Sequence, residues 1–446
     1  MQISLKNKTK LNGVQILALG FLAVIIIGAV ILSLPISSRS GEPTNFLDAI
    51  FTSTSAVCVT GLITLDTSTH WSTFGQTVIM ALIEIGGLGF MSFTVLISLI
   101  LGKKITLRER LVMQEAMNTF SIQGLVRMVK YVLIFTVSVQ FFGALLLSTQ
   151  FVPEYGIIKG FFYSIFHSIS AFCNAGFDLF GTSLVGYSNN TVVILVISAL
   201  IIIGGLGFTV LLELYDFKGI KKLSLHAKIV IITTLILIFG GTLLMLLFEH
   251  KNPQTIANMN IKDKLLNSFF ASVTPRTAGF NSISTSGMTL ASKILTVILM
   301  LIGGSPGSTA GGLKTVTCAI LVLTVISVIR GREDTEVFGR RLTKEIVYKS
   351  FIIVFIGLSL VIGVTMILSY TEVGASFIDL LYETSSALGT VGLTLGLTPN
   401  LSSLGKIFIM IMMYLGRVGP LTVMLALTRK RKKSGYKYPE GKILIG

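Results

Sequence analysis

The sequence predicts an all-α polytopic membrane protein with four membrane–pore–membrane repeats, in which eight transmembrane helices and four re-entrant pore helices surround a pseudo-fourfold pore. The 446 residues are 52% hydrophobic and only 13% charged, whereas soluble proteins carry roughly 25% charged residues. Several apolar runs reach the about 20 residues that a membrane span needs. Between these runs, short segments that end in glycine repeat one pattern.

Long apolar segments and the short glycine-ended segments divide the chain into repeat units. The predicted spans lie near residues 14–35, 72–101, 125–150, 190–214, 227–249, 290–329, 346–370 and 402–428. The units are residues 1–103, 104–217, 218–331 and 332–430, and residues 431–446 form a tail. The basic N-terminus is not followed by a small-residue cleavage pattern, so we expect no cleaved signal peptide.

Basic residues lie in alternate loops of this plan. They account for much of the formal net charge of +16 and are Lys103, Lys104, Arg108, Arg110, Lys218, Lys221, Lys222, Arg330, Arg332, Arg340, Arg341, Lys344 and the tail run 429–433. Because cytoplasmic loops carry an excess of Lys and Arg, we expect both termini on the cytoplasmic side of the plasma membrane. The basic face could also bind anionic membrane lipid or an acidic partner. Nucleic-acid binding is not expected, because topology explains the basic excess.

The repeated segments cover residues 46–62, 161–177, 265–280 and 377–393. Each begins with aromatic or aliphatic residues at helical spacing, continues with small and hydroxyl residues, and ends in glycine followed by Leu or Phe. About 12 helical residues extend only ~18 Å, whereas the hydrocarbon core is ~30 Å thick. These segments are therefore predicted to be re-entrant pore helices.

The candidate ion-binding residues are the triplets that end in these glycines. They are Val59, Thr60 and Gly61; Asn174, Ala175 and Gly176; Thr277, Ala278 and Gly279; and Thr390, Val391 and Gly392. Rings of backbone carbonyls can replace the hydration shell of K⁺, and glycine permits the backbone angles that aim successive carbonyls at one axis. The negative C-terminal ends of the pore helices would also favour a cation. The alternative is that the glycines only permit turns or helix packing.

A second glycine pattern recurs in the later span of each unit. IEIGGLGF (83–90) and IIIGGLGF (201–208) are nearly identical, and LIGGSPGS (301–308) and YLGRVGPL (414–421) occupy the matching places. The third copy continues into GGSPGSTAGG, which is Gly303, Gly304, Ser305, Pro306, Gly307, Ser308, Thr309, Ala310, Gly311 and Gly312. It divides a segment that would be ~60 Å long as one helix. The break could plug or line the pore as a gate, or it could be a passive kink.

Two basic residues lie beside this predicted gate. Arg417 follows ten apolar or small positions in the fourth unit, and a charge at such depth is a functional-site hypothesis by default. Its expected partners are carbonyls and hydroxyls of Ser305, Ser308 and Thr309. Lys314 directly follows the loop. Either side chain could instead reach the cytoplasmic interface.

Other polar residues occupy apolar surroundings. Glu84 could face a cavity or form a structural pair. His167 and Glu383 lie on pore helices, where they could hydrogen-bond the filter backbone from behind. Asp48 and Asp379 lie near pore-helix starts, where a carboxylate offsets the positive helix end. Three scattered cysteines, Cys58, Cys173 and Cys318, favour neither a disulfide framework nor a zinc site.

The segments TGL, CNAGF, TPRTAGF and TVGL, the eight-span plan and the chain length resemble the Trk/Ktr/HKT superfamily of cation transporters, in particular the membrane subunits of bacterial Ktr potassium uptake systems. The resemblance covers essentially the whole chain. It implies a channel-like K⁺ uptake transporter in which the four glycines go with potassium selectivity. Because serine at the first position is associated with sodium transport in that family, Gly61 favours potassium. The loop would be the gate under the filter, with Arg417 contacting it.

The resemblance also implies partners that composition does not indicate. These are a homodimer with one pore per protomer, a cytoplasmic ring of KtrA-type regulatory subunits that binds ATP or ADP, and activation by Na⁺. The chain itself has neither a phosphate loop nor a dinucleotide fingerprint, so we expect no nucleotide to bind it. The membrane potential can drive cation entry, at about 2.3 kcal/mol per charge per 100 mV.

We do not expect an enzyme, because the histidines His70, His167, His226 and His250 are dispersed and no acids, bases or metal ligands converge. A carrier would more often show inverted halves and paired broken helices. Here only the segment 290–329 is plainly broken in the sequence, and the repeat is fourfold.

Overall fold

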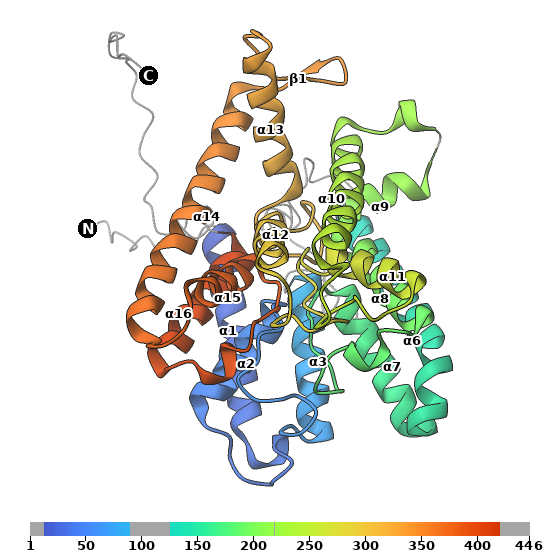
Figure 1. Ribbon diagram of the computed structural model, residues 1–446, viewed down its shortest axis with the longest axis vertical. Coiled ribbons are helices and arrows are strands. Elements are labelled where there is room, and N and C mark those ends of the chain that lie inside the picture. Colours follow the sequence, from blue (N-terminus) through green and yellow to red (C-terminus); the bar gives the residue numbers. More distant parts are fainter. Residues whose placement is uncertain (1–12, 90–124, 218, 420–446) are drawn as a thin grey trace, which may run out of the picture.

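The computed structural model describes residues 13–89, 125–217 and 219–419, which are mostly helical (Figure 1). The helices are α1 (Gly13–Ser33), α2 (Phe46–Val57), α3 (Thr73–Leu88), α6 (Leu125–Tyr155), α7 (Ile157–Phe172), α8 (Thr191–Leu206), α9 (Phe208–Tyr215), α10 (Leu225–Glu249), α11 (Ile261–Val273), α12 (Leu290–Leu301), α13 (Thr315–Ile329), α14 (Lys344–Thr371), α15 (Phe377–Gly389) and α16 (Ser403–Val418). Short 3₁₀ turns cover Pro35–Ser37, Val185–Tyr187, Ile220–Lys222 and Thr398–Asn400. Strands β1 (Glu336–Val337) and β2 (Arg340–Arg341) form an antiparallel hairpin that joins α13 to α14.

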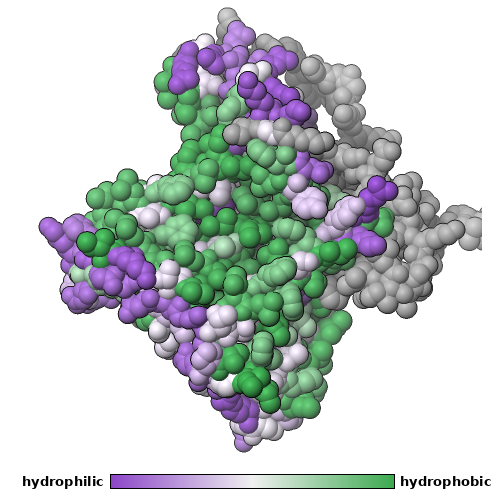
Figure 2. Space-filling view, turned by 90° about the vertical axis from the view of Figure 1, so that its right-hand side faces the viewer, coloured by the Kyte–Doolittle hydropathy of each residue, from purple (hydrophilic) through white to green (hydrophobic). Residues whose placement is uncertain are grey.

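The long helices have the length and composition of membrane spans. Among the described residues, α1, α6, α10 and α14 each contain an apolar stretch long enough to cross a membrane, and the bent pair α8–α9 brings the total to as many as five. Apolar side chains cover most of the face in Figure 2, and hydrophilic ones gather toward its edges. The protein is therefore an all-α polytopic membrane protein, as the sequence predicts.

The predicted pore helices α2, α7, α11 and α15 have only 12, 16, 13 and 13 residues, or about 18 to 24 Å. In three of them an Asn or Ser side chain accepts a hydrogen bond from the first turn, which satisfies an otherwise free N–H. Asp379 completes a capping box with Ser376, in agreement with its predicted place at a helix start.

Contacts between the predicted units follow a cycle. The later helix of each unit packs against the pore helix of the next: α3 on α7, α8 on α11, α12 on α15, and α16 back on α2. Residues far apart in the sequence therefore meet at one centre, toward which the C-terminal ends of the pore helices point.

Three predicted straight spans end early. α3 ends at Leu88 and α16 at Val418, whereas α8 ends at Leu206 and the chain turns by 102° into α9. Each helix is followed by a glycine with φ between 80° and 94°, namely Gly89, Gly207 and Gly419. Glycine adopts this left-handed conformation without the penalty that a side chain brings.

The expectation that only segment 290–329 is broken is therefore wrong, because the span predicted at 190–214 is broken as well. The span predicted at 290–329 consists of α12 and α13. Residues 90–101 and 420–428 of the other two spans, like the tail 431–446, lie outside the described residues.

An ion pair joins the first unit to the last. Lys406 Nζ of α16 lies 2.7 Å from the Asp48 carboxylate of α2, with side chains that are only 16% and 17% exposed. Asp48, predicted to offset the helix end, thus also closes the cycle of units.

We expect Asp48→Asn to lower the free energy of unfolding by about 1–3 kcal/mol, because it leaves the Lys406 ammonium without its charged partner. Thermal unfolding of purified protein, followed by fluorescence of the single tryptophan, would measure the loss. Glu336→Gln is the matched control, because its ion pair with Arg332 is about half exposed and such pairs contribute about 0–1 kcal/mol. Equal shifts in both variants would contradict the stabilising role of the Asp48 pair.

Candidate functional site

The four predicted filter glycines meet in a closed ring. A Cβ atom added to Gly61 would lie 3.1 Å from the Cα of Gly176, and one on Gly176 would lie 2.9 Å from the Cα of Gly279. The corresponding distances from Gly279 to Gly392 and from Gly392 to Gly61 are 3.3 and 3.0 Å. Each added Cβ would also lie within 2.7 Å of the carbonyl oxygen that precedes the neighbouring glycine. The structure thus brings all four triplets together.

The triplets share an unusual backbone conformation. Their first residues have positive φ values, at Val59 56°, Asn174 59°, Thr277 71° and Thr390 50°, and the glycines have φ between 71° and 93°. The middle residues do not have positive φ. Positive φ therefore occurs at the first and third residue of each triplet, on either side of a residue without it. A left-handed residue with a side chain costs roughly 1–2 kcal/mol, so the surrounding structure must hold these triplets in place.

Part of that support comes from the ends of the pore helices. The N–H groups of Thr60, Ala175 and Val391, which are middle residues of triplets, each donate to a serine carbonyl 2.8 Å away. The N–H of Ala278 donates to Thr274 over 2.9 Å. The serines are Ser55, Ser170 and Ser386. The N–H groups of the four middle residues thus all have partners at the ends of these helices.

The hydroxyls of the same residues add further support. Ser55 and Ser386 accept hydrogen bonds from the filter glycines Gly61 and Gly392 over 3.0 Å. Ser170 and Thr274 donate to the carbonyl of the residue that follows the glycine. The predicted site did not include these four residues. The repeated spacing in SAVCVTG, SAFCNAG and SALGTVG is the signal that could have found the three serines, whereas Thr274 stands five rather than six residues before its glycine.

Residues 303–312 lie against this ring at the ends of the pore helices. The hydroxyl of Thr309 is 3.0 Å from the carbonyl oxygens of both Phe172 and Gly204, and its N–H also donates to Gly204. A Cβ added to Gly311 would lie 2.1 Å from Oγ1 of Thr390, a filter residue. Ser305 and Thr309 are fully buried. The loop is thus held against the ends of these helices and the predicted filter triplets.

The loop is also bonded to the helix breaks of other units. The N–H of Ser305 donates to Gly205, and the carbonyl of Gly307 accepts from the N–H of Phe208 over 2.8 Å. The N–H of Gly312 donates to the carbonyl of Gly416 on α16. The loop therefore joins the second and fourth units.

Arg417 contacts the loop, as predicted, through the carbonyl of Thr309. The same guanidinium donates to the carbonyls of Gly86 and Gly87 at the end of α3, so it connects the loop to the first unit. No hydrogen bond from Arg417 to Ser305 or Ser308 is present among the described residues. Lys314 Nζ lies 2.7 Å from the Ala310 carbonyl and 3.3 Å from the Gly311 carbonyl. Both cations therefore face the loop in this structure.

His167 and Glu383 support the segments that follow the filter rather than the filter triplets themselves. Nε2 of His167 accepts from the N–H of Leu179 over 3.2 Å. The Glu383 carboxylate accepts from the hydroxyls of Thr394 and Thr398.

Glu84 forms a structural pair rather than facing an open cavity. Its carboxylate accepts from Gln140 over 2.8 Å and from the Cys173 thiol over 3.2 Å. All three cysteines are free. No group of His, Cys, Asp and Glu suited to a metal occurs among the described residues.

The repeated second glycine pattern has a packing reason. A Cβ added to Gly86, Gly204 or Gly416 would lie 2.0–2.1 Å from the carbonyl oxygen of a residue just before a filter triplet. These oxygens belong to Val57, Phe172 and Leu388. Each glycine allows a later helix to touch the end of the pore helix in its own unit.

Comparisons with known proteins agree with this geometry. The sequence model of the family "TrkH: Cation transport protein" matches residues 8–435. The chain is 47% identical to the potassium/sodium uptake protein NtpJ of Enterococcus hirae, with 98% of each chain covered. It is 45% identical to the Ktr system potassium uptake protein B of Bacillus subtilis, over 97% of this chain and 96% of that protein. The Ktr system potassium uptake protein B of Vibrio alginolyticus is 38% identical, with 99% and 96% covered.

Among solved structures, the potassium transporter TrkH from Vibrio parahaemolyticus matches with a TM-score of 0.73. It is 20% identical and covers 95% of this chain and 86% of that one. The family model and these relatives identify the chain as an integral membrane cation transporter, not an enzyme. The chain belongs to the TrkH/Ktr family of cation transport proteins.

We expect Gly204→Ala to disrupt the site, because its Cβ would lie 2.0 Å from the Phe172 carbonyl oxygen and backbone atoms would have to move. Yield of monodisperse protein and cation flux in liposomes should both fall sharply. Gly240→Ala on α10 is the control, because nothing lies within 4 Å of its added Cβ and alanine favours a helix by about 1 kcal/mol over glycine. Normal yield and flux of Gly204→Ala would contradict the packing argument.

Proposed function

We propose that the chain is the membrane subunit of a channel-like potassium uptake system, in which K⁺ passes down its electrochemical gradient through a filter with one glycine per repeat. The observation that carries this proposal is the closed ring of Gly61, Gly176, Gly279 and Gly392, with left-handed backbone at matched positions. The names of the relatives, which include potassium and potassium/sodium uptake proteins, support the choice of cation.

The chemistry of the ring suits an alkali cation. Carbonyl oxygens from four chain segments can replace the hydration shell of K⁺, and the pore helices direct their negative ends toward it. The N–H groups of the four middle residues are bonded to serine and threonine residues at the ends of the pore helices, so they are not turned toward an ion in the ring. The membrane potential supplies the driving force, at about 2.3 kcal/mol per charge per 100 mV, without a nucleotide on this chain.

We assign residues 303–312, together with Lys314 and Arg417, as the gate. A passive kink needs no partners outside its own helix, whereas this loop is bonded to Gly204, Gly205, Phe208, Gly416 and, through Arg417, to the end of α3. Such contacts tie its position to the helices that surround the filter. Movement of those helices would therefore move the loop.

The proposed assembly extends the resemblance to Ktr membrane subunits. It is a homodimer in the plasma membrane with both termini cytoplasmic and one pore per protomer. A cytoplasmic ring of KtrA-type subunits, which bind ATP or ADP, would control the gate, and Na⁺ would act as an activator. The basic cytoplasmic loops suit the docking of such a ring.

Serine at any filter glycine should weaken the preference for K⁺ over Na⁺ by at least about tenfold, which corresponds to about 1.4 kcal/mol. The added side chain would meet the neighbouring triplet, where each Cβ already lies within 2.7 Å of an oxygen. Voltage-driven K⁺ and Na⁺ flux into liposomes would measure this preference. Gly396→Ser is the control, because Gly396 also has positive φ but open space around it. Unchanged selectivity in all four variants would end the filter proposal.

Thr309→Val should raise basal flux through the chain. The change keeps the side-chain shape but removes a hydroxyl that lies 3.0 Å from two carbonyl oxygens, which weakens the seated loop by about 1–3 kcal/mol. A loss of 1.4 kcal/mol would raise the open fraction about tenfold. Thr309→Ser should keep flux low, as should Ser308→Ala, whose hydroxyl bonds only within the loop. Identical flux in Thr309→Val and the parent chain would favour the passive kink.

A further inference from the structure

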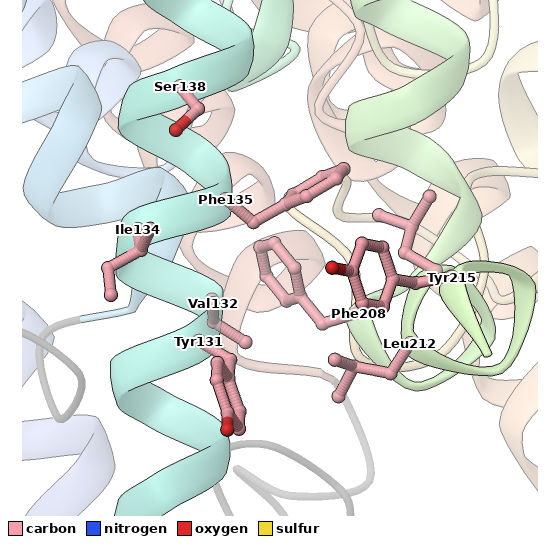
Figure 3. A pocket seen from close by; sticks show the side chains of 9 residues that line it. Tyr131, Val132, Ile134, Phe135, Ser138, Phe208, Leu212 and Tyr215 are labelled. Carbon is pink, nitrogen blue, oxygen red and sulfur yellow. The ribbon is translucent and has the colours of Figure 1, made fainter.

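A cavity outside the proposed filter and gate lies between α6 and α9. Its volume is about 370 Å³, and Figure 3 shows aromatic and aliphatic side chains from both helices around it. Tyr131 and Phe135 contribute from α6, and Phe208, Leu212 and Tyr215 contribute from α9. Among the described residues that line it, only Ser138 and the two tyrosines carry polar side-chain atoms. Such a cavity suits a hydrocarbon chain and offers little to a polar ligand.

Several lining residues are exposed on the surface of a membrane-spanning helix. Tyr131 and Ile134 are 52% and 54% exposed, and Tyr215 on α9 is 87% exposed. Tyrosine is enriched where the hydrocarbon meets the headgroup region. The cavity is therefore accessible from the lipid phase near the beginning of α6.

Basic residues precede the cavity along α6. Arg127 and Lys130 are exposed, and Arg127, Tyr131 and Ile134 share a face because residues three and four apart are neighbours on a helix. Arg127 lies about 6 Å before Tyr131 along the axis. Along α6, basic side chains are followed by a tyrosine and then by apolar side chains. This order matches that of an anionic phospholipid, in which the phosphate is followed by the glycerol and then by the acyl chains.

The cavity is also joined to the loop under the filter. Phe208 lines it, and the N–H of the same residue donates to the carbonyl of Gly307 in the loop over 2.8 Å. The preceding residue, Gly207, has its α-carbon against the Pro306 carbonyl, where an added Cβ would lie 2.6 Å from the oxygen. An occupant that fixes α9 therefore fixes two backbone contacts of the loop.

We propose that this cavity binds an acyl chain of an anionic phospholipid whose phosphate is held by Arg127 and Lys130, and that the bound lipid keeps α9 in the position that seats the loop. The first part concerns binding and stands on the cavity alone. The second part rests on the proposed function of residues 303–312 as a gate.

Binding can be tested on the full chain without any transport assay. Native mass spectrometry would compare retention of phosphatidylglycerol and phosphatidylcholine after both are supplied in equal amounts. We expect the parent chain to retain phosphatidylglycerol, Arg127→Gln/Lys130→Gln to lose the preference at least fivefold, and Leu212→Trp, which fills the cavity, to lose the bound lipid. Arg332→Gln/Arg340→Gln near the β1–β2 hairpin is the charge-matched control and should retain it. Unchanged lipid retention in a Leu212→Trp variant with the thermal stability of the parent chain would overturn the site. A parent chain that retains no lipid would also overturn it and would mean that residues of this chain fill the cavity.

The link to the loop needs a second readout. We expect basal K⁺ flux of the parent chain to be lower in liposomes that contain phosphatidylglycerol than in phosphatidylcholine alone, and Arg127→Gln/Lys130→Gln to abolish that difference. Lipid retention with flux that is indifferent to phosphatidylglycerol would overturn the link and leave the binding site. If no variant or lipid gives K⁺ flux, the proposed transport function fails, whereas the retention experiment still decides the lipid site.

Discussion

The contact of four backbone segments at one ring is the constraint on which the rest of the structure depends. No side chain fits between Gly61, Gly176, Gly279 and Gly392, and the non-helical backbone there lies inside a membrane protein. Such backbone is tolerated only if its polar groups have partners or line a watery cavity. The ends of the pore helices satisfy the N–H groups through backbone carbonyls and hydroxyls. Under the proposed function the triplet carbonyls bind the ion, so the bonds that support the fold also hold the proposed ion site in shape.

The ring imposes demands on the helices around it. The later helix of a unit must approach the end of its pore helix closely, which Gly86, Gly204 and Gly416 permit. Each of these helices then ends two residues after the close contact, and a left-handed glycine is the next residue. The same glycine pattern thus provides both the approach and the break. In the third unit the break is lengthened into the loop, which fills the space that the other breaks surround.

The glycine ring and the loop could be predicted from the sequence because each interrupts an apolar segment. Neither a continuous transmembrane helix nor ordinary helix packing requires such an interruption. Arg417 was found for a similar reason, since a charge in such surroundings needs a partner. The break after α8 was missed because GGLGF contains no proline, and hydropathy does not distinguish a helix that ends at glycine from one that continues through it. The partners of Glu84 and Lys406 lie in other units, at distances that depend on the three-dimensional arrangement. The supporting serines look like ordinary small residues until the triplet N–H groups are placed beside them.

The two cations beside the loop suggest how a cation pathway could be closed. Arg417 and Lys314 contact the carbonyls of Thr309, Ala310 and Gly311, which are consecutive in the chain. Carbonyl oxygens are also the ligands that a permeating alkali cation would use. While the side chains of Arg417 and Lys314 hold these oxygens, the oxygens are not free to bind a permeating cation. The two positive charges also repel that cation. Under the proposed function, opening must therefore move the loop and its cations together, and Arg417 can transmit that movement because it also holds the end of α3.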